Sequence, residues 1–413
     1  MLSGVSFLVG FLLIRYGSNT DYGMFVVVQA TILLLTCAQS AWLSGPLAVL
    51  APKMPAQERR EMVGAIKLSQ RRFVRQLALL ALTVPAIGYA LGAWNDLVAC
   101  VVAGAVLAGW AALQRDYLRA LLLMYSRPQA VLRADFIYVL VFLSAALIAA
   151  FGPGPAVIWA VGGLVAAAWA GGIVANRSLA TDPGWVAGDA SEYWRKLRPM
   201  GVWSTSGALI YWLYTQSYNY VLASQINLTA VADVNAARLL LMPAMVLTAG
   251  ITGMMIPSAA IWLAEFGLRR LLRRLSIFFV CIAALDLIYI ALVWVFRDWL
   301  SGDLLRKTIG DRDRLLLLWA LVALIGLTRD MFGCAMAALG LFKPMARLSA
   351  ACAVLSLSLI WFGLSRWGPA AALIGQIAGE TLNLAGFAFL LWRADRRAPT
   401  PVDPGRGSGQ PSL

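Results

Sequence analysis

The chain has 413 residues, of which 61% are hydrophobic and 13% are charged, and its mean hydropathy is +0.76. Soluble domains carry about 25% charged residues, so a water-soluble fold could not bury this much apolar surface. The sequence contains no histidine, which excludes histidine metal clusters and Ser-His or Cys-His catalytic pairs. We therefore expect a membrane protein that is not an enzyme and has no cofactor.

Apolar runs recur along the whole chain. A helix needs about 20 apolar residues to cross the hydrocarbon core of a bilayer, which is about 30 Å thick. Division of the chain at charges, Pro and Gly gives about twelve such runs. They are residues 2–16, 23–45, 76–94, 97–114, 135–151, 156–176, 201–223, 233–256, 277–296, 315–335, 346–364 and 370–392. The pattern predicts an all-α polytopic membrane protein.

The first run is short for a membrane span. As a helix, residues 2–16 reach only about 22 Å. They cross the membrane only if the helix begins earlier or the bilayer is thinner there.

The Lys and Arg residues set the orientation, because positively charged loops stay in the cytoplasm. With the N-terminus inside, most of the 34 basic residues fall in cytoplasmic segments. These segments are 53–75, 115–133, 177–198, 269–274, 343–347 and 393–406. We therefore expect a multi-pass protein of the bacterial inner membrane with both termini in the cytoplasm. This topology explains the net charge of +14 without a nucleic-acid partner, and residues 59–75 favour a helix at the membrane surface.

A short motif occurs twice. Arg115-Asp116 lies near the end of the fourth run and Arg329-Asp330 near the end of the tenth, and a basic residue followed by proline comes after each. Six helices separate the copies, and an even number preserves orientation, so the motif favours a parallel repeat of two six-helix lobes. Chance recurrence is the alternative, and both pairs are interpreted as structural pairs on the cytoplasmic side. The expected divisions are an N-terminal lobe (1–176), a cytoplasmic linker (177–200), a C-terminal lobe (201–392) and a disordered tail (393–413).

Two stretches resemble polysaccharide flippases. Residues 12–17 and 21–25 are similar to their helix 1 to helix 2 junction, where an Arg-containing helix end precedes a Tyr-Gly pair. Residues 236–243 and 256–259 are similar to their helix 8, which closes with a proline near the cytoplasm. The chain thus resembles the Wzx-type flippases of lipid-linked oligosaccharides, the polysaccharide transporter branch of the MOP superfamily.

The resemblance implies a V-shaped pair of lobes around a cavity lined mainly by helices 1, 2, 7 and 8, and transport by alternating access. The implied substrate is an undecaprenyl-diphosphate-linked oligosaccharide, moved from the cytoplasmic to the periplasmic leaflet for exopolysaccharide, O-antigen or capsule synthesis. The expected partners are this substrate and the lipid bilayer, and they could include a polysaccharide polymerase or a chain-length regulator.

A diphosphate needs cationic partners. Arg238 in the eighth run and Arg15 at the end of the first are the candidates, since a charge in the membrane costs about 2.5–3.5 kcal/mol unless a cavity or a partner compensates it. The alternatives are an ion pair of Arg238 with Asp233 or Asp286, and placement of the Arg15 head group at the membrane surface.

The run 201–223 carries an unusual number of aromatic and polar residues. Sugars bind to flat aromatic faces surrounded by amides and hydroxyls, so this helix is a candidate glycan surface. One stripe at helical spacing is formed by Tyr211, Tyr214 and Tyr218, and a neighbouring stripe by Trp212, Gln216 and Asn219. Polar contacts between helices are the alternative role for these side chains.

Two carboxylates lie near predicted bilayer midplanes. Asp286 and Glu380 are candidates for ion coupling, unless each is simply paired within its lobe. A MATE-like cation-coupled exporter of small molecules is the alternative function. It would need acidic residues in the first lobe, where the acids of the first six runs fall at or near helix ends.

Overall fold

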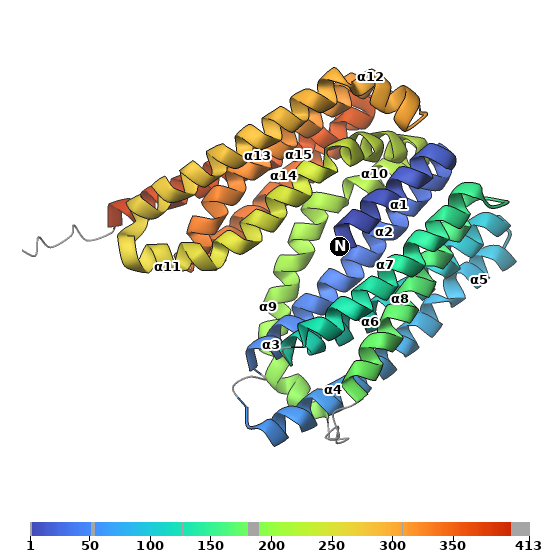
Figure 1. Ribbon diagram of the computed structural model, residues 1–413, viewed down its shortest axis with the longest axis horizontal. Helices are drawn as coiled ribbons and strands as arrows, with labels where there is room; N and C mark the ends of the chain where they lie inside the picture. The colour runs from blue at the N-terminus through green and yellow to red at the C-terminus, as the bar shows by residue number, and fades with distance from the viewer. Residues whose placement is uncertain (1, 51–53, 126, 181–189, 308, 398–413) are drawn as a thin grey trace, which may run out of the picture.

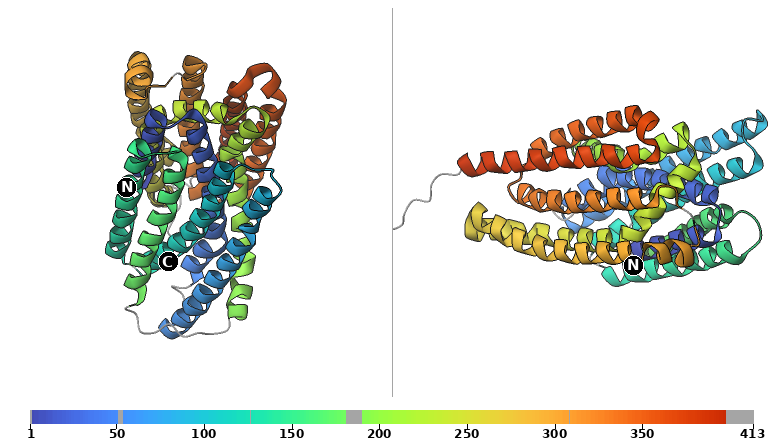
Figure 2. Two further views of the ribbon diagram at one scale, coloured as in Figure 1. Left: turned by 90° about the vertical axis from the view of Figure 1, so that its right-hand side faces the viewer. Right: turned by 90° about the horizontal axis from the view of Figure 1, so that it is seen from above.

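The computed structural model describes residues 2–50, 54–125, 127–180, 190–307 and 309–397, and these are almost entirely helical. The helices form two groups that meet at one end and separate at the other, so that the molecule has the shape of a V (Figure 1). Two further views show the same long, nearly parallel helices in each group (Figure 2). The prediction of an all-α fold with two lobes is confirmed.

The N-terminal lobe contains six predicted spans. Its elements are α1 (Leu2–Tyr16), α2 (Asn19–Gln39) with η1 (Ser40–Ser44) and α3 (Gly45–Leu50), α4 (Ala56–Ala81) with α5 (Thr83–Ala90), α6 (Asp96–Met124), α7 (Pro128–Phe151) and α8 (Ala156–Ala180). Local sequence signals set several boundaries. Ser18 and Asp21 form a capping box at the start of α2, and Asn95 caps α6 by accepting a hydrogen bond from the Val98 amide.

The rest of the chain forms the second group of helices. Its elements are α9 (Ala190–Gln216), α10 (Tyr218–Gln225), α11 (Leu228–Val295), α12 (Arg297–Trp299), η3 (Leu300–Leu304), α13 (Arg312–Ala338), α14 (Phe342–Trp367), η4 (Gly368–Ala370) and α15 (Ala371–Arg397). Inside α11, Gly267 has a φ of 72° and turns the chain back on itself. Glycine adopts this conformation without the steric cost that a Cβ brings, and the turn divides α11 into the predicted eighth and ninth spans.

Every predicted run overlaps helix in the described ranges, and nine helices there are long and apolar enough to cross a membrane. Three boundaries differ most from the prediction. Residues 59–75 do not form a separate surface helix, because α4 continues directly from them into the third span. Helix α6 runs on to Met124 rather than ending at residue 114. Residues 190–200, predicted as linker, begin α9; residues 181–189 and 398–413 lie outside the described residues.

The packing of apolar side chains explains the V shape. One core cluster joins both lobes at the end where α1 meets α2, and it includes Leu13, Tyr22, Val231 and Trp319. At the other end, each lobe has its own core, around Met62 in the first lobe and around Leu271, Leu275 and Phe279 in the second. We call these the closed end (residues 16–18, 226–227, 296–307 and 309–311) and the open end (residues 54–56, 125, 127–128, 267 and 339–342).

Candidate functional site

A cavity of about 550 Å³ lies between the lobes. Helix α2 provides the largest share of its lining, α1 and α6–α8 provide further parts, and α11 and the end of α9 close it from the second lobe. Most of its lining is apolar or uncharged. Its charged lining residues are Arg115, Asp116, Arg119 and Arg238.

Arg238 is the basic residue that the second lobe contributes to this cavity. It lies about three turns into α11 and is half-buried. Its guanidinium stands over the ring of Trp319, 5.4 Å from the ring centroid. It also interacts electrostatically with the hydroxyl groups of Tyr22 and Tyr218. No carboxylate among the described residues lies within ion-pair distance of it. Arg238 is therefore a cation whose charge is not neutralised by a neighbouring acid.

The two alternative partners of Arg238 are engaged elsewhere. The carboxylate of Asp233 lies beside Gly310 at the closed end. The buried carboxylate of Asp286 accepts a hydrogen bond of 2.9 Å from the Thr248 hydroxyl. The pairings that the sequence left open for Arg238 are thus not formed.

The first lobe contributes a compact charged cluster. Asp135 on α7 accepts from Arg115 at 2.6 Å and from Arg119 at 3.1 Å, and Arg115 also lies 3.3 Å from Asp116. The Arg115 guanidinium stands 4.0 Å from the ring centroid of Tyr138. Because α6 extends beyond its predicted end, Arg115 lies about two and a half turns before the end of the helix, in the wall of the cavity.

The second lobe contains a similar cluster. Both carboxylate oxygens of Glu380 on α15 accept from Arg329 at 2.7 Å, and Arg329 Nε donates to Asp330 at 2.9 Å. Each Arg-Asp pair of the repeated motif thus binds a buried carboxylate from another helix of its own lobe. Glu380 is fully paired in this arrangement, which is the alternative that the sequence left open for it.

The candidate glycan residues do not share one surface. Helix α9 ends at Gln216 and α10 begins at Tyr218, so the helical spacing is interrupted within the stripe. Tyr211 is 60% exposed, whereas Tyr214 packs against Cys352 in the second lobe. Trp212 is buried and donates to the Ala30 carbonyl on α2 at 3.0 Å. The three tyrosines therefore do not form one continuous helical stripe, and the role of these residues as glycan ligands stays a prediction.

Three of these residues form a buried polar chain instead. Asn219 donates to Gln216, which lines the cavity, and Asn235 donates to Asn219 at 2.7 Å. Tyr218 in turn donates to Asn235 at 3.2 Å. This series of hydrogen bonds connects the amide groups at the cavity wall to the buried side chains beside Arg238.

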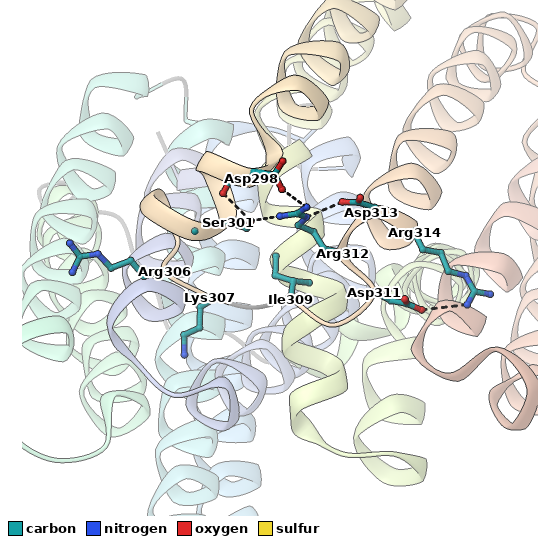
Figure 3. A pocket seen from close by; sticks show the side chains of 10 residues that line it. Asp298, Ser301, Arg306, Lys307, Ile309, Asp311, Arg312, Asp313 and Arg314 are labelled. Carbon is teal, nitrogen blue, oxygen red and sulfur yellow. Dashed lines mark hydrogen bonds and ion pairs between the residues drawn. The ribbon is translucent and has the colours of Figure 1, made fainter.

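Arg15 lies at the closed end, outside the cavity. Its Nη1 donates to the Leu304 carbonyl at 2.6 Å, and Lys307 donates to the Gly17 carbonyl at 2.7 Å. Arg312 contacts side chains of α12, η3 and α13 and so stabilises the segment that carries Leu304 and Lys307. The Lys307 side chain points away from Arg312 and its partners (Figure 3). These contacts connect α1 to the loop before α13 and so bridge the two lobes.

Sequence reasoning missed Arg115 and Arg119 as cavity residues. The available signal was the apolar run that continues past Asp116 as far as Met124, which lengthens the helix. Within the described residues, no group of three or more Cys, Asp or Glu side chains could hold a metal ion.

No family model matches the chain, and no curated protein matches it by sequence. Similar folds occur among solved structures. An inward-facing multidrug resistance MATE family transporter of the MOP superfamily superposes with a TM-score of 0.76 at 13% identity, over 96% of both chains. The lipid II flippase MurJ in an inward closed conformation also gives 0.76, at 10% identity, over 94% of this chain and 85% of that one. The chain has the MOP-superfamily fold.

The conformation can be compared within the MOP fold. An outward-facing MATE transporter gives a TM-score of 0.60 at 14% identity, over 95% of this chain and 92% of that one. The lobes are therefore arranged more nearly as in the inward-facing structure. Together with the apolar helices, the MOP fold identifies a multi-pass membrane protein.

Proposed function

We propose that this protein is a flippase of the bacterial inner membrane that moves an undecaprenyl-diphosphate-linked oligosaccharide from the cytoplasmic to the periplasmic leaflet by alternating access. Arg238 is the observation that carries this proposal. It is a cation without an acidic partner in a cavity between two lobes, and such a group favours an anionic ligand.

The cavity offers groups for both parts of a lipid-linked headgroup. A guanidinium can donate two parallel hydrogen bonds to a phosphate, which suits Arg238 to the diphosphate. The uncharged polar lining residues Ser6, Gln29, Thr36, Gln216 and Asn235 can hydrogen-bond to sugar hydroxyls. Tyr211 is exposed and lies outside the cavity lining, where it can offer an aromatic face to a sugar ring.

The direction of opening supports the same proposal. The described basic segments of α4, of α9, of the Gly267 turn and of the α13–α14 connection all lie toward the open end. By the positive-inside rule, the open end then faces the cytoplasm, where a lipid-linked sugar unit is assembled.

A cation exporter of the MATE kind is the second candidate, since MATE transporters share the fold. The cavity chemistry favours it less. Asp116 is the acid among the described cavity residues, and it lies 3.3 Å from Arg115 in a lining that also contains Arg119 and Arg238. A free cation would meet more positive than negative charge there.

Asp286 fits an ion-coupling role better than Glu380. Glu380 is held by Arg329 through both oxygens, so protonation of Glu380 would break a buried ion pair. Asp286 has one hydrogen-bond donor, Thr248, and no basic side chain of the described residues within ion-pair distance. Asp286 can therefore exchange a proton at a lower energetic cost.

The proposal is tested with the purified protein in liposomes that contain an undecaprenyl-diphosphate-linked sugar. We expect Arg238→Ala to lower the rate of translocation at least tenfold, because the diphosphate loses about 1.5–3 kcal/mol of charged hydrogen bonding. We expect Arg238→Lys to retain part of the rate. Arg273→Ala, which removes an exposed arginine beyond the Gly267 turn and outside the cavity, is the control.

Two outcomes contradict the proposal. One is an Arg238→Ala variant that inserts normally and translocates at the wild-type rate. The other is efflux of a cationic dye driven by a proton or sodium gradient, without translocation of the lipid-linked sugar, which would favour the MATE-like function.

A further inference from the structure

A long groove runs along the side of α2 that faces away from the cavity. It consists of two hollows of about 600 and 850 Å³ between α2, α4 and α6, the second of which extends to α9. The hollows share Leu35, Val74, Leu77 and Leu113, so they are continuous. We call them together the α2–α4 groove.

The helix arrangement explains why the groove exists. Helix α4 packs mainly on α6 and on α9 and reaches α2 through a hydrogen bond of 2.8 Å from Gln70 to Gln39, so most of α2 stays uncovered on this side. Met24, Thr31 and Leu35 of α2 face the groove, whereas Phe25 and Gln29 face the cavity. The α2–α4 groove is thus separated from the cavity by α2 and α6.

The chemistry changes along the groove. In the hollow of about 600 Å³ the lining is almost entirely aliphatic, and its one hydroxyl group is that of Thr31. Near the open end it becomes polar and basic, and the residues there are Gln39, Ser69, Gln70, Trp194, Arg195 and Arg198. An apolar channel that ends in cations has the polarity of a lipid with an acidic headgroup.

The two arginines are free to bind a ligand. Arg195 and Arg198 are exposed, and neither has an ion-pair partner in the part of the chain that the structure describes. The nearby acids are used by Lys196, which lies 3.0 Å from Glu192 and 3.7 Å from Glu58. The charge at this end of the groove therefore lacks a counterion among the residues that the structure describes.

The length of the groove indicates which lipid fits. From Met24 to Gln39 it follows α2 for about 23 Å, at 1.5 Å per residue. One leaflet provides only about half of the 30 Å hydrocarbon thickness, so a phospholipid acyl chain would cover about 15 Å of it. A single hydrocarbon chain that extends beyond one leaflet would cover the whole groove.

We infer that the α2–α4 groove is a docking site for a polyprenyl phosphate, with the chain along α2 and α4 and the phosphate at Arg195 and Arg198. The site lies outside the cavity and does not depend on transport through it. It would hold the polyprenyl phosphate beside the open end of the protein.

The inference is tested by titration of the purified full-length protein in detergent with undecaprenyl phosphate. Leu77→Trp fills the groove where its two hollows meet, and Arg195→Ala with Arg198→Ala removes the charge. We expect each variant to raise Kd at least tenfold. Leu80→Trp adds the same volume on the same helix, at an exposed position outside the groove, and should bind as the wild type does.

Several outcomes would overturn this inference. Unchanged affinity in both groove variants would do so, as would equal competition by dioleoylphosphatidylglycerol, which would indicate an ordinary lipid contact. If Leu77→Trp fails to fold, Val106→Trp fills the groove from α6. Loss of binding in Arg238→Ala with normal binding in the groove variants would place the ligand in the cavity. If the protein binds undecaprenyl phosphate but does not translocate the lipid-linked sugar, the flippase proposal is disproved and the groove inference stands.

Discussion

Three arginine residues within the long helices lie in different environments. Arg115 is buried and shares Asp135 with Arg119, and Arg329 is held by Glu380 and Asp330. Arg238 has an aromatic ring and tyrosine hydroxyls around it but no acid. A buried ion pair fixes structure, whereas an unpaired cation in a cavity is available to a ligand.

The buried pair in the first lobe gives a prediction about stability. We expect Asp135→Asn to lower the free energy of unfolding by about 3 kcal/mol, because it leaves Arg115 buried without its closest carboxylate. Denaturant unfolding of the protein in micelles measures the effect. Glu265→Gln, which removes an exposed acid, should change it by less than about 0.5 kcal/mol. Equal stability of the two variants would show that Asp135 does not compensate Arg115.

The Tyr22-Gly23 pair, part of the resemblance to polysaccharide flippases, has a geometric reason in this fold. Tyr22 is buried beside Arg238, and a Cβ on Gly23 would collide with the Leu228 carbonyl at the start of α11. The glycine thus allows α2 and α11 to approach each other at the closed end.

At the scale of elements, the segment from α12 to the start of α13 closes one side of the molecule. Arg312 fixes the segment internally, and Arg15 and Lys307 attach it to carbonyl groups across the lobe boundary. Arg15 as a ligand of the diphosphate stays a prediction. In this conformation its Nη1 is occupied by the Leu304 carbonyl, so the closed end must separate before Arg15 can bind a phosphate.

Removal of these attachments should loosen the closed end. We expect Arg15→Ala combined with Lys307→Ala to increase the population with separated lobes, because two hydrogen bonds from charged donors are lost, each worth about 1.5–3 kcal/mol. Spin labels at Ala93→Cys and Arg366→Cys, exposed on the two lobes, report the separation by pulsed electron resonance. An unchanged distance distribution would contradict the role of these contacts.

The closed end should also respond to alkaline pH. Burial lowers the pKa of Lys307 below its ordinary value of 10.5, and Asp21 opposes the shift only in part. In the pH window just below 10.5, Lys307 is less protonated in the closed end than it is in water. Lys307 therefore takes up a proton when the closed end separates and releases it when the closed end forms. A rise in pH through this window should therefore favour the closed end. The same labels measure it, and Lys307→Arg, which does not titrate there, should abolish the dependence.

At the scale of the whole molecule, the two lobes share a core at the closed end and have separate cores at the open end. Rocking of one lobe against the other would leave the two separate cores intact and rearrange the shared one. The repeated Arg-Asp pairs lie within the lobes, each bound to a carboxylate of its own lobe, so such a motion preserves them.

The orientation of the whole molecule is a further prediction. In intact cells, a membrane-impermeant maleimide should label Asp303→Cys at the closed end and should label Arg273→Cys at the open end only after permeabilisation. The native cysteines are replaced for this experiment, because Cys100 and Cys281 are exposed on the protein surface. The opposite labelling pattern would place the basic segments outside and contradict cytoplasmic termini.

The sequence alone determined that this is an all-α, multi-pass membrane protein, and it gave the positions of nearly all spans. In lipid each backbone group must be bonded within its own helix, so the span is a local property that hydropathy reveals. The Arg-Asp repeat was also visible in the sequence, because its orientation follows from the number of helices between its two copies.

Only the tertiary structure decided which charges meet and which faces line a cavity. Asp135 lies 20 residues from Arg115, and Glu380 lies 51 residues from Arg329, and no spacing along one helix predicts such contacts. The break between α9 and α10 likewise turned tyrosines of one predicted stripe to different surroundings. Inside a membrane both polar and apolar faces can be buried, so the composition of a helix does not reveal its neighbours; the packing of the other helices does.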